Sequence, residues 1–112
     1  DNLAVYIDAN GQQCDGKVET VMALEPLARR FEAFGARALD ISGHDPEAID
    51  AASAAKADGK PLVVICRTDP CRGVPILEDR APKLHYLRFV SEAERAGYRS
   101  YFETTMVPAA KE

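Results

Sequence analysis

The feature that most constrains the fold of this chain is a short apolar run, Leu62-Val-Val-Ile-Cys66. A continuous run of this length is typical of a β-strand that is covered on both faces, which is the usual environment of strands in parallel sheets. The segment Asp58-Gly-Lys-Pro61 interrupts the chain just before it, as a turn would. The run therefore predicts a mostly parallel sheet that is buried between helices.

Strand-like and helix-like segments alternate on either side of this run. Further strands are predicted over residues 3–8 and 37–41, and the loop after the first strand is expected to extend to about Glu19. A helix is predicted next, with Pro26 in its first turn and Gly35 at its end. Its apolar positions follow helical spacing and are Leu24, Leu27, Ala28 and Phe31. The fold class expected from this alternation is α/β, a mostly parallel sheet with flanking helices.

A second helix is predicted to begin at Pro46 and to run to about Ala57. Asp45 stands just before it, where an aspartate side chain can accept hydrogen bonds from the free amides of the first helical turn. The turn before it, Ser42-Gly-His-Asp45, gives His44 a structural role in this interpretation.

The last part of the chain is expected to hold a long loop and a final helix. Residues 68–90 are predicted to be an irregular loop, because Pro and Gly recur in them. Residues 91–107 are predicted to be the last helix, which Ser91 and Glu94 would start as a capping box. Core packing or a subunit contact is the interpretation of its apolar stripe, which consists of Tyr98, Tyr101, Phe102 and Met106.

Composition places the chain among ordinary water-soluble domains. It has 112 residues, of which 46% are hydrophobic, and a net charge of −4, so one domain or part of one is expected. Its basic residues are scattered, which favours neither nucleic acid nor a membrane as a partner. Three cysteines form no disulfide framework, and no signal peptide is recognised, so a cytoplasmic location is expected.

The first predicted strand leads into a loop rich in polar residues and glycine, Asp8-Ala-Asn10-Gly-Gln-Gln-Cys-Asp-Gly16. Open α/β sheets bind their ligands beyond the carboxyl ends of the strands, which is where this loop would lie. Asn10 and Gly11 are therefore candidate binding residues. A plain turn is the alternative, because Asn-Gly is a common turn dipeptide.

The loop and four other motifs together resemble the carboxyl-terminal part of the diphosphate-binding domain of the transketolase family. The resemblance covers about the first ninety residues, and its motifs occur in the order and near the spacing of that family. These motifs are Asp8-Ala-Asn10-Gly-Gln12 with Asp15-Gly16, Leu24-Glu-Pro-Leu-Ala28, Ala33-Phe-Gly35, Gly43-His-Asp45 and Gly59-Lys-Pro61.

This resemblance implies a thiamine diphosphate-binding fold in which the diphosphate is held through Mg²⁺ or Ca²⁺. Asn10 occupies the position whose side-chain oxygen binds the metal, and Gln12 occupies the position that supplies a backbone carbonyl. Both are oxygen ligands, which hard cations prefer. Gly11 between them would allow the turn that directs both oxygens to one point. Asp8 is expected to accept hydrogen bonds from loop amides instead of binding the metal.

The resemblance also makes His85 a candidate for contact with the diphosphate or for proton transfer near the substrate. In this chain the surrounding order is Arg80-Ala-Pro-Lys-Leu-His-Tyr86, which departs from the family's Trp-His-Gly-Lys-Ala-Pro. A surface loop histidine is the alternative interpretation.

Residues 1–112 are expected to be a partial diphosphate-binding domain, because the Gly-Asp-Gly segment that supplies the family's metal-binding aspartate is not in them. A pyrimidine-binding domain or subunit would complete the site, in a homodimer or a heterotetramer. The implied activity is transfer of a two-carbon ketol unit from a ketose, such as a sugar phosphate, to an aldehyde. The isolated chain is expected to be inactive.

Two other functions remain open at the level of sequence. A related two-carbon transferase could use pyruvate or a carrier protein. Alternatively, the chain could be a noncatalytic domain that keeps the fold and its dimerisation surface without binding the cofactor.

Overall fold

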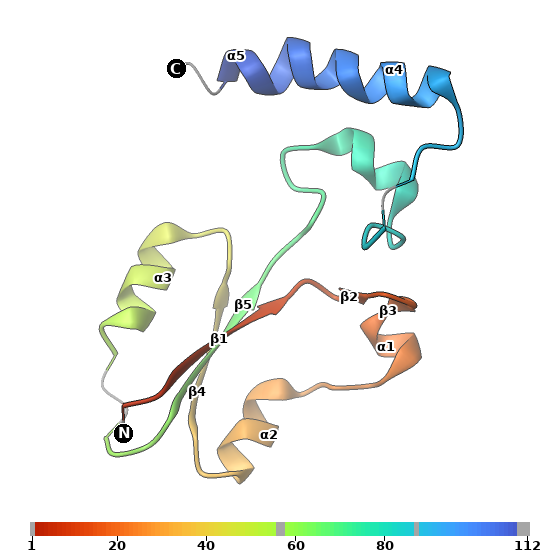
Figure 1. Cartoon of the computed structure of the whole chain (residues 1–112). Helices are drawn as coiled ribbons and strands as arrows, with labels where there is room; N and C mark the ends of the chain where they lie inside the picture. Colours follow the sequence, from red (N-terminus) through yellow and green to blue (C-terminus); the bar gives the residue numbers. More distant parts are fainter. Residues whose placement is uncertain (1, 56–57, 87, 110–112) are drawn as a thin grey trace. The chain divides into compact units, whose positions relative to one another are not determined.

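The computed structural model describes residues 2–55, 58–86 and 88–109 (Figure 1). The chain divides into two units, residues 1–70 and residues 71–112. The first unit contains the sheet and the loop around Asn10, and the second contains the helices at the end of the chain. Each unit is described by itself.

A parallel sheet forms the centre of the first unit. Within the described residues it has three strands in the order β1 (Ala4–Ala9), β5 (Leu62–Arg67) and β4 (Arg37–Ser42). Strand β5 contains the apolar run and pairs with a neighbour along each edge. Its Val64 and Ile65 are fully buried. The predicted α/β fold with a parallel sheet is therefore confirmed.

Helix α3 (Pro46–Ser53) covers one face of this sheet. Its Ala52 packs in a buried cluster with Leu62 and Val64 of β5, and partly buried side chains of β4 complete the cluster. The predicted N-cap is confirmed, because Asp45 Oδ1 accepts hydrogen bonds from the amides of residues 47 (3.0 Å) and 48 (3.3 Å). The helix ends at Ser53, earlier than predicted, and residues 56–57 lie outside the described part of the chain.

Helix α2 (Leu27–Ala33) lies on the other side of the strands from α3 in Figure 1, and it contacts β4 and β5. The predicted start of this helix was too early, since Pro26 is the N-cap and Leu24 precedes the helix. The cause is local: the Glu25 carboxylate accepts a hydrogen bond from the Leu27 amide (3.0 Å), which defines the first turn at that point.

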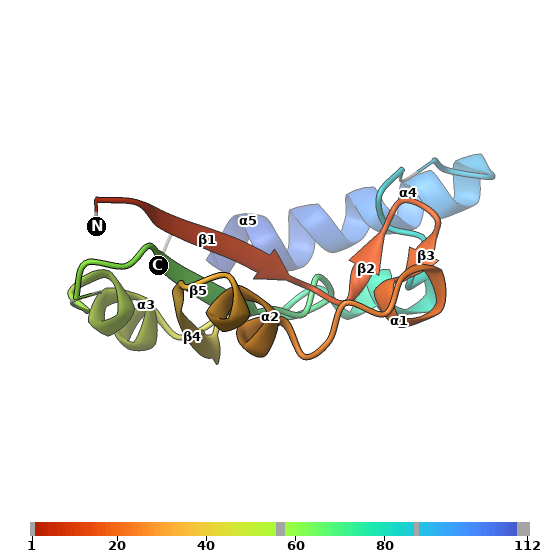
Figure 2. The same ribbon diagram turned by 90° about the horizontal axis from the view of Figure 1, so that it is seen from below.

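The segment after β1 contains more regular structure than the sequence predicts. Strands β2 (Gln12–Gln13) and β3 (Gly16–Lys17) form a small antiparallel hairpin, and the short helix α1 (Val18–Val21) follows directly. Figures 1 and 2 show this hairpin beyond the carboxyl end of β1. The expectation of a loop up to about Glu19 is therefore corrected: the polar run closes on itself as a hairpin.

In the second unit, the segment expected to be irregular contains the 3₁₀ helix η1 (Pro75–Arg80). Helix α4 (Glu92–Tyr101) follows, with Ser91 as its N-cap. It continues through the π-helical turn η2 (Phe102–Met106) into α5 (Val107–Ala109). The chain thus stays helical from residue 92 to residue 109, where the sequence predicts a helix over 91–107.

Polar contacts hold α4 against η1 within this unit. The hydroxyls of Tyr98 and Tyr101 donate to the carbonyls of residues 76 and 73, each at 3.1 Å. The Glu94 carboxylate accepts from Arg80 Nε (2.8 Å) and from the amide of residue 90 (2.6 Å). The apolar stripe of this helix is only partly buried, because Phe102 remains 53% exposed.

Candidate functional site

The loop at the carboxyl end of β1 is shaped by the side chain of Asn10. Asn10 Oδ1 accepts a hydrogen bond from the Gln12 amide (2.9 Å), and Asn10 Nδ2 donates to Asp8 Oδ2 (3.2 Å). Gly11, which lies between Asn10 and Gln12, has a φ of +71°, a value that residues with a side chain rarely adopt. A Cβ at this position would meet no atom within 4 Å. The requirement for glycine at this position is therefore conformational and not steric.

Asp8 joins the end of β1 to the segment that follows β5. Its Oδ1 accepts a hydrogen bond from the Thr68 hydroxyl, and its Oδ2 accepts one from the side-chain amide of Asn10. The expectation that Asp8 accepts from loop amides is met by the side-chain amide of Asn10, whereas the Thr68 hydroxyl is a donor that the sequence did not predict. The reason is the register of the sheet, which pairs Asp8 with Cys66 and brings residue 68 close to the end of β1.

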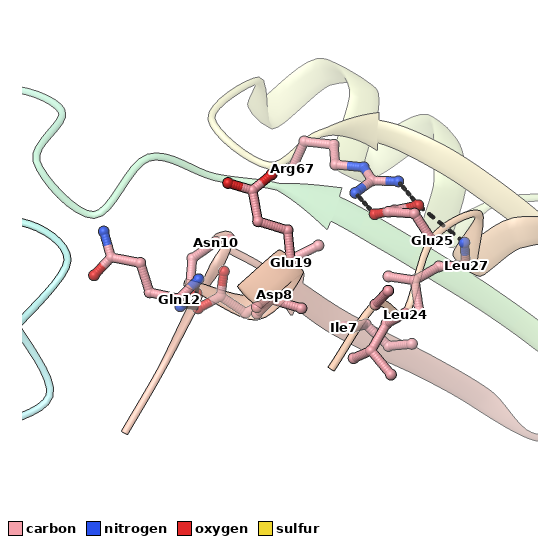
Figure 3. Close-up of a pocket in the computed structure, with 13 residues that line it drawn as sticks. Ile7, Asp8, Asn10, Gln12, Glu19, Leu24, Glu25, Leu27 and Arg67 are labelled. Carbon is pink, nitrogen blue, oxygen red and sulfur yellow. Dashed lines mark hydrogen bonds and ion pairs between the residues drawn. The ribbon is translucent and has the colours of Figure 1, made fainter. Parts of the chain in front are cut away.

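A cavity of about 430 Å³ opens beside this loop, and all of its lining residues belong to the first unit. Figure 3 shows Asp8, Asn10 and Glu19 on one side of it and Leu24, Glu25 and Leu27 on another. The side chain of Gln12 extends away from the other labelled residues. The remaining lining residues are Ile7, Ala9, Gly11, Val18, Ala23 and Arg67.

A cluster of three charged side chains, here called the Arg67 cluster, stands at the edge of this cavity. Arg67 Nε and Nη2 donate to the two oxygens of Asp40 at 2.9 Å and 2.6 Å. Arg67 Nη1 and Nη2 donate to the two oxygens of Glu25, the latter bond at 3.1 Å. Both contacts are bidentate, the strongest geometry of an arginine–carboxylate pair.

The hydrogen bonds of the cluster shift the pKa values of Glu25 and Arg67. Hydrogen bonding to Arg67, helped by the Leu27 amide, lowers the pKa of Glu25 from 4.5 to about 2. The carboxylates of Asp40 and Glu25 raise the pKa of the Arg67 guanidinium above its ordinary value. Glu25 and Arg67 are therefore charged at neutral pH.

Sequence reasoning did not identify this cluster. Arg67 follows immediately after the apolar run of β5, so its position at the carboxyl end of a buried strand was a signal that could have been used. The choice of its partners was not readable, because Glu25 and Asp40 are 42 and 27 residues away along the chain.

His44 has a structural contact, in agreement with the interpretation of its turn. Its Nε2 accepts a hydrogen bond from the Asp69 amide at 2.7 Å, which joins the turn after β4 to the segment after β5. Gly43, in the same turn, is packed closely against the segment after β5, since a Cβ there would be 2.5 Å from a side-chain carbon of Thr68. Both residues fix the backbone near the ends of the strands.

The candidate residues fall into two groups. Asn10, Gly11 and Gln12 lie together in the first unit, next to the cavity. His85 lies in the second unit, where its exposed ring meets Tyr86 edge-on with 4.5 Å between centroids. Contact of His85 with a cofactor stays a prediction.

The donor atoms of the Asn10–Gln12 loop suit a hard cation. The Asn10 side-chain oxygen accepts one amide hydrogen bond and has a second lone pair for another partner. Within residues 2–55, 58–86 and 88–109, no three His, Cys, Asp or Glu side chains are grouped so that they could hold a metal ion. A metal bound by Asn10 and the Gln12 carbonyl would therefore take its other ligands from a diphosphate, from water or from residues outside this group.

Among the described residues, no helix is long and apolar enough to span a lipid bilayer.

The chain is similar to several known proteins. Residues 1–85 match the family model of the transketolase thiamine diphosphate binding domain. An uncharacterised transketolase family protein of Sinorhizobium fredii, y4mO, is 41% identical over 91 residues, which cover 79% of this chain and 32% of that protein.

Two further relatives are named as subunits of transketolases. An apulose-4-phosphate transketolase subunit of Actinobacillus succinogenes is 32% identical over 77% of this chain and 31% of its own length. The 6-deoxy-6-sulfo-D-fructose transketolase subunit SqwG of a Clostridium species is 31% identical over 86% of this chain and 35% of its own length. No solved structure gives a significant match.

The chain spans about a third of the length of these curated relatives. The family match, in contrast, covers most of the chain and includes the strand, the Asn10–Gln12 loop and the cavity residues. The resemblance seen in the sequence motifs is thereby confirmed: the chain belongs to the transketolase family and represents part of its thiamine diphosphate binding domain.

Proposed function

We propose that this chain is part of a thiamine diphosphate-dependent transketolase subunit, in which the Asn10–Gln12 loop holds the metal ion and the diphosphate. The observation that carries the proposal is the position of this loop. It lies at the carboxyl end of β1, beside a cavity of about 430 Å³, inside the segment that matches the thiamine diphosphate binding domain. Ligands of α/β sheets bind at such ends.

The charges around the cavity support the participation of a divalent cation. Its lining contains the carboxylates of Asp8, Glu19 and Glu25 and the guanidinium of Arg67, which already pairs with Glu25. Outside the lining, Lys17 Nζ lies 3.9 Å from Glu19 Oε1 at the surface. A diphosphate would meet a net negative lining, so a divalent ion between the phosphates and the loop would compensate the repulsion. Mg²⁺ or Ca²⁺ fits this role.

The residues of the chain would bind and orient the cofactor and would not perform the chemistry themselves. Asn10 would bind the metal through its side-chain oxygen and Gln12 through its backbone carbonyl, while Gly11 maintains the turn. His85 would donate a hydrogen bond to the diphosphate or to the substrate, as an imidazole can near neutral pH. When bound, thiamine diphosphate supplies the nucleophile that carries a two-carbon ketol unit from a ketose to an aldehyde.

A second polypeptide or domain is part of this proposal. Two of the relatives are named as subunits of a transketolase, which supports a complementary pyrimidine-binding subunit for this chain as well. A homodimer or a heterotetramer would then form the complete site. The proposed substrates are sugar phosphates or related ketoses and aldehydes, and the proposed location is the cytoplasm.

Calorimetry of the full-length subunit with its pyrimidine-binding partner tests the proposal. Thiamine diphosphate is titrated in the presence of Mg²⁺ into the wild type, Asn10→Ala and Asn2→Ala. We expect Asn10→Ala to weaken metal-dependent binding by about tenfold or more, because a metal ligand is lost. Asn2→Ala is the matched control, since Asn2 is exposed and precedes β1.

The outcomes separate two parts of the proposal. Absence of binding by the wild type would refute the function. Equal affinity of the wild type and Asn10→Ala would refute the assignment of Asn10 as a metal ligand.

A further inference from the structure

One wall of the cavity beside the Asn10–Gln12 loop is formed by the segment that leads into α2 and by the first residue of that helix. This segment, residues 23–27, is called the cavity wall below; it runs into the first turn of α2 and contributes Ala23, Leu24, Glu25 and Leu27 to the lining. Side chains of β1 and the hairpin line other parts of the same cavity. The dimensions of the cavity therefore depend on what holds this segment in place.

The Arg67 cluster connects the cavity wall to the sheet. Register places Asp40 opposite Ile65 of β5, so Asp40 and Arg67 lie two residues apart along one face of the sheet. Asp40 orients the guanidinium from that face, and the guanidinium then holds the Glu25 carboxylate with two hydrogen bonds. Figure 3 shows Glu25 directed at Arg67 from the cavity wall.

Further hydrogen bonds link the position of Glu25 to the backbone conformation of the cavity wall. Glu25 Oε2 also accepts the hydrogen bond of the Leu27 amide, which begins α2. Arg30 Nη2 donates to the carbonyls of Ala23 (3.2 Å) and Glu25 (3.4 Å) from the next turn of the same helix. These bonds are local to residues 23–30, whereas the hydrogen bonds between Glu25 and Arg67 connect the wall to a side chain of strand β5.

An arginine beside a diphosphate site is usually interpreted as a phosphate ligand, and the geometry argues against that role here. Its Nε, Nη1 and Nη2 groups all donate to the carboxylates of Glu25 and Asp40. Releasing Arg67 to an anion would leave the carboxylates of Glu25 and Asp40 without the guanidinium that pairs with them.

We propose that Arg67 is a positioning residue of the cofactor site: through Glu25 it fixes the cavity wall at the distance from the Asn10–Gln12 loop that the cofactor requires. This inference rests on the proposed function. Arg67 does not bind the diphosphate. Its contribution to cofactor affinity depends on the bidentate contacts of the guanidinium with both Asp40 and Glu25 and on the negative charge of Glu25.

Calorimetry with thiamine diphosphate and Mg²⁺ on the full-length subunit together with its partner tests this role. Arg67→Lys keeps the charge but cannot form two bidentate contacts, so we expect it to weaken binding about tenfold. Glu25→Gln is expected to weaken binding by a similar factor, because it removes the charge that holds the wall. A phosphate-binding Arg67 would behave in the opposite way: lysine would preserve much of the affinity, and Glu25→Gln would free the guanidinium and strengthen binding.

A double-mutant cycle and a matched control complete the experiment. The combined Arg67→Lys, Glu25→Gln variant should bind about as weakly as either single variant, because both substitutions break one contact. Arg29→Lys is the control, since Arg29 is an exposed arginine on α2 that does not line the cavity. Glu25→Gln is isosteric and keeps an acceptor for the Leu27 amide, so it reports on the contact even if Arg67→Lys folds poorly.

The outcomes distinguish this inference from the proposed function. If the wild type binds no thiamine diphosphate, the proposed function fails. If the wild type binds and either Arg67→Lys retains full affinity or Glu25→Gln binds more tightly, the positioning role is wrong and the proposed function stands.

Discussion

At the scale of single residues, the site depends on side chains that shape the backbone around them. Asn10 closes its own loop by accepting a hydrogen bond from the amide of residue 12. Glu25 accepts the hydrogen bond that begins α2 and also pairs with Arg67. In both cases one oxygen-bearing side chain sets the geometry of a cavity boundary. The contact of Glu25 also has a consequence for the dependence of stability on pH.

Glu25 is expected to make the folded subunit less stable in acid. Its pKa is about 2 in the folded chain, against 4.5 for a glutamate without these contacts. A lowered carboxyl pKa stabilises the fold fully above pH 4.5, and this contribution is lost as the pH falls from about 4.5 toward 2. Because the side chain is 56% exposed, solvent screening limits the contribution to about 1 kcal/mol.

Urea unfolding of the wild type and Glu25→Gln at about pH 6 and about pH 2.5 measures this contribution. The wild type should be more stable than the variant at the higher pH, and the difference should shrink at the lower pH. A difference in stability that stays constant between the two pH values would show that the ion pair with Arg67 does not lower the pKa of Glu25.

At the scale of elements, α3 carries the clearest link between a local motif and the core. Asp45 caps the helix, and the helix then places Ala52 against the buried residues of β5. The cap is exposed, so its effect is separable from core packing.

Asp45→Ala is expected to destabilise the subunit by about 1 kcal/mol, because two amides of the first turn lose their acceptor. Asp45→Ser keeps an acceptor and should cost only about a few tenths of a kcal/mol, as an ordinary cap exchange does. Midpoints of urea unfolding at neutral pH provide the comparison. Equal loss in the two variants would mean that Asp45 acts through something other than the cap.

At the scale of the whole molecule, the sheet of the first unit depends on its central strand. Strand β5 pairs with β1 and β4, its Leu62 and Val64 pack under α3, and its last residue Arg67 reaches the cavity. One strand therefore connects the core to the candidate site.

Ile65 provides the sharpest test of this core, because it has no exposed surface. Ile65→Ala is expected to cost about 3 kcal/mol through lost burial and a cavity, and Ile65→Val about 1 kcal/mol. Val5→Ala on the partly exposed edge strand β1 is the comparison and should cost less than Ile65→Ala. Urea unfolding of the three variants ranks them, and a loss for Val5→Ala equal to that for Ile65→Ala would contradict a core centred on β5.

Much of the fold and part of the site could be predicted because the signals are local. The apolar run at 62–66 requires burial on both faces, and Asp45 before Pro46 requires a helix start. The Asn10-Gly-Gln12 motif indicates both a turn and a binding loop. Boundaries were less accurate: α2 begins later than its apolar spacing indicates, because the Glu25 side chain decides which amide is first.

By itself, the sequence determined the alternation of the main strands and helices, the parallel sheet and the turn at Gly11, since periodicity, caps and turn residues act over a few positions. The family followed from the resemblance of the motifs. Only the tertiary structure decided that β5 lies between β1 and β4 and that Arg67 meets Glu25 and Asp40. These contacts join residues 27 and 42 positions apart. No local pattern encodes such pairs, because strand order and register, which bring distant side chains onto one face, arise only when the whole sheet forms.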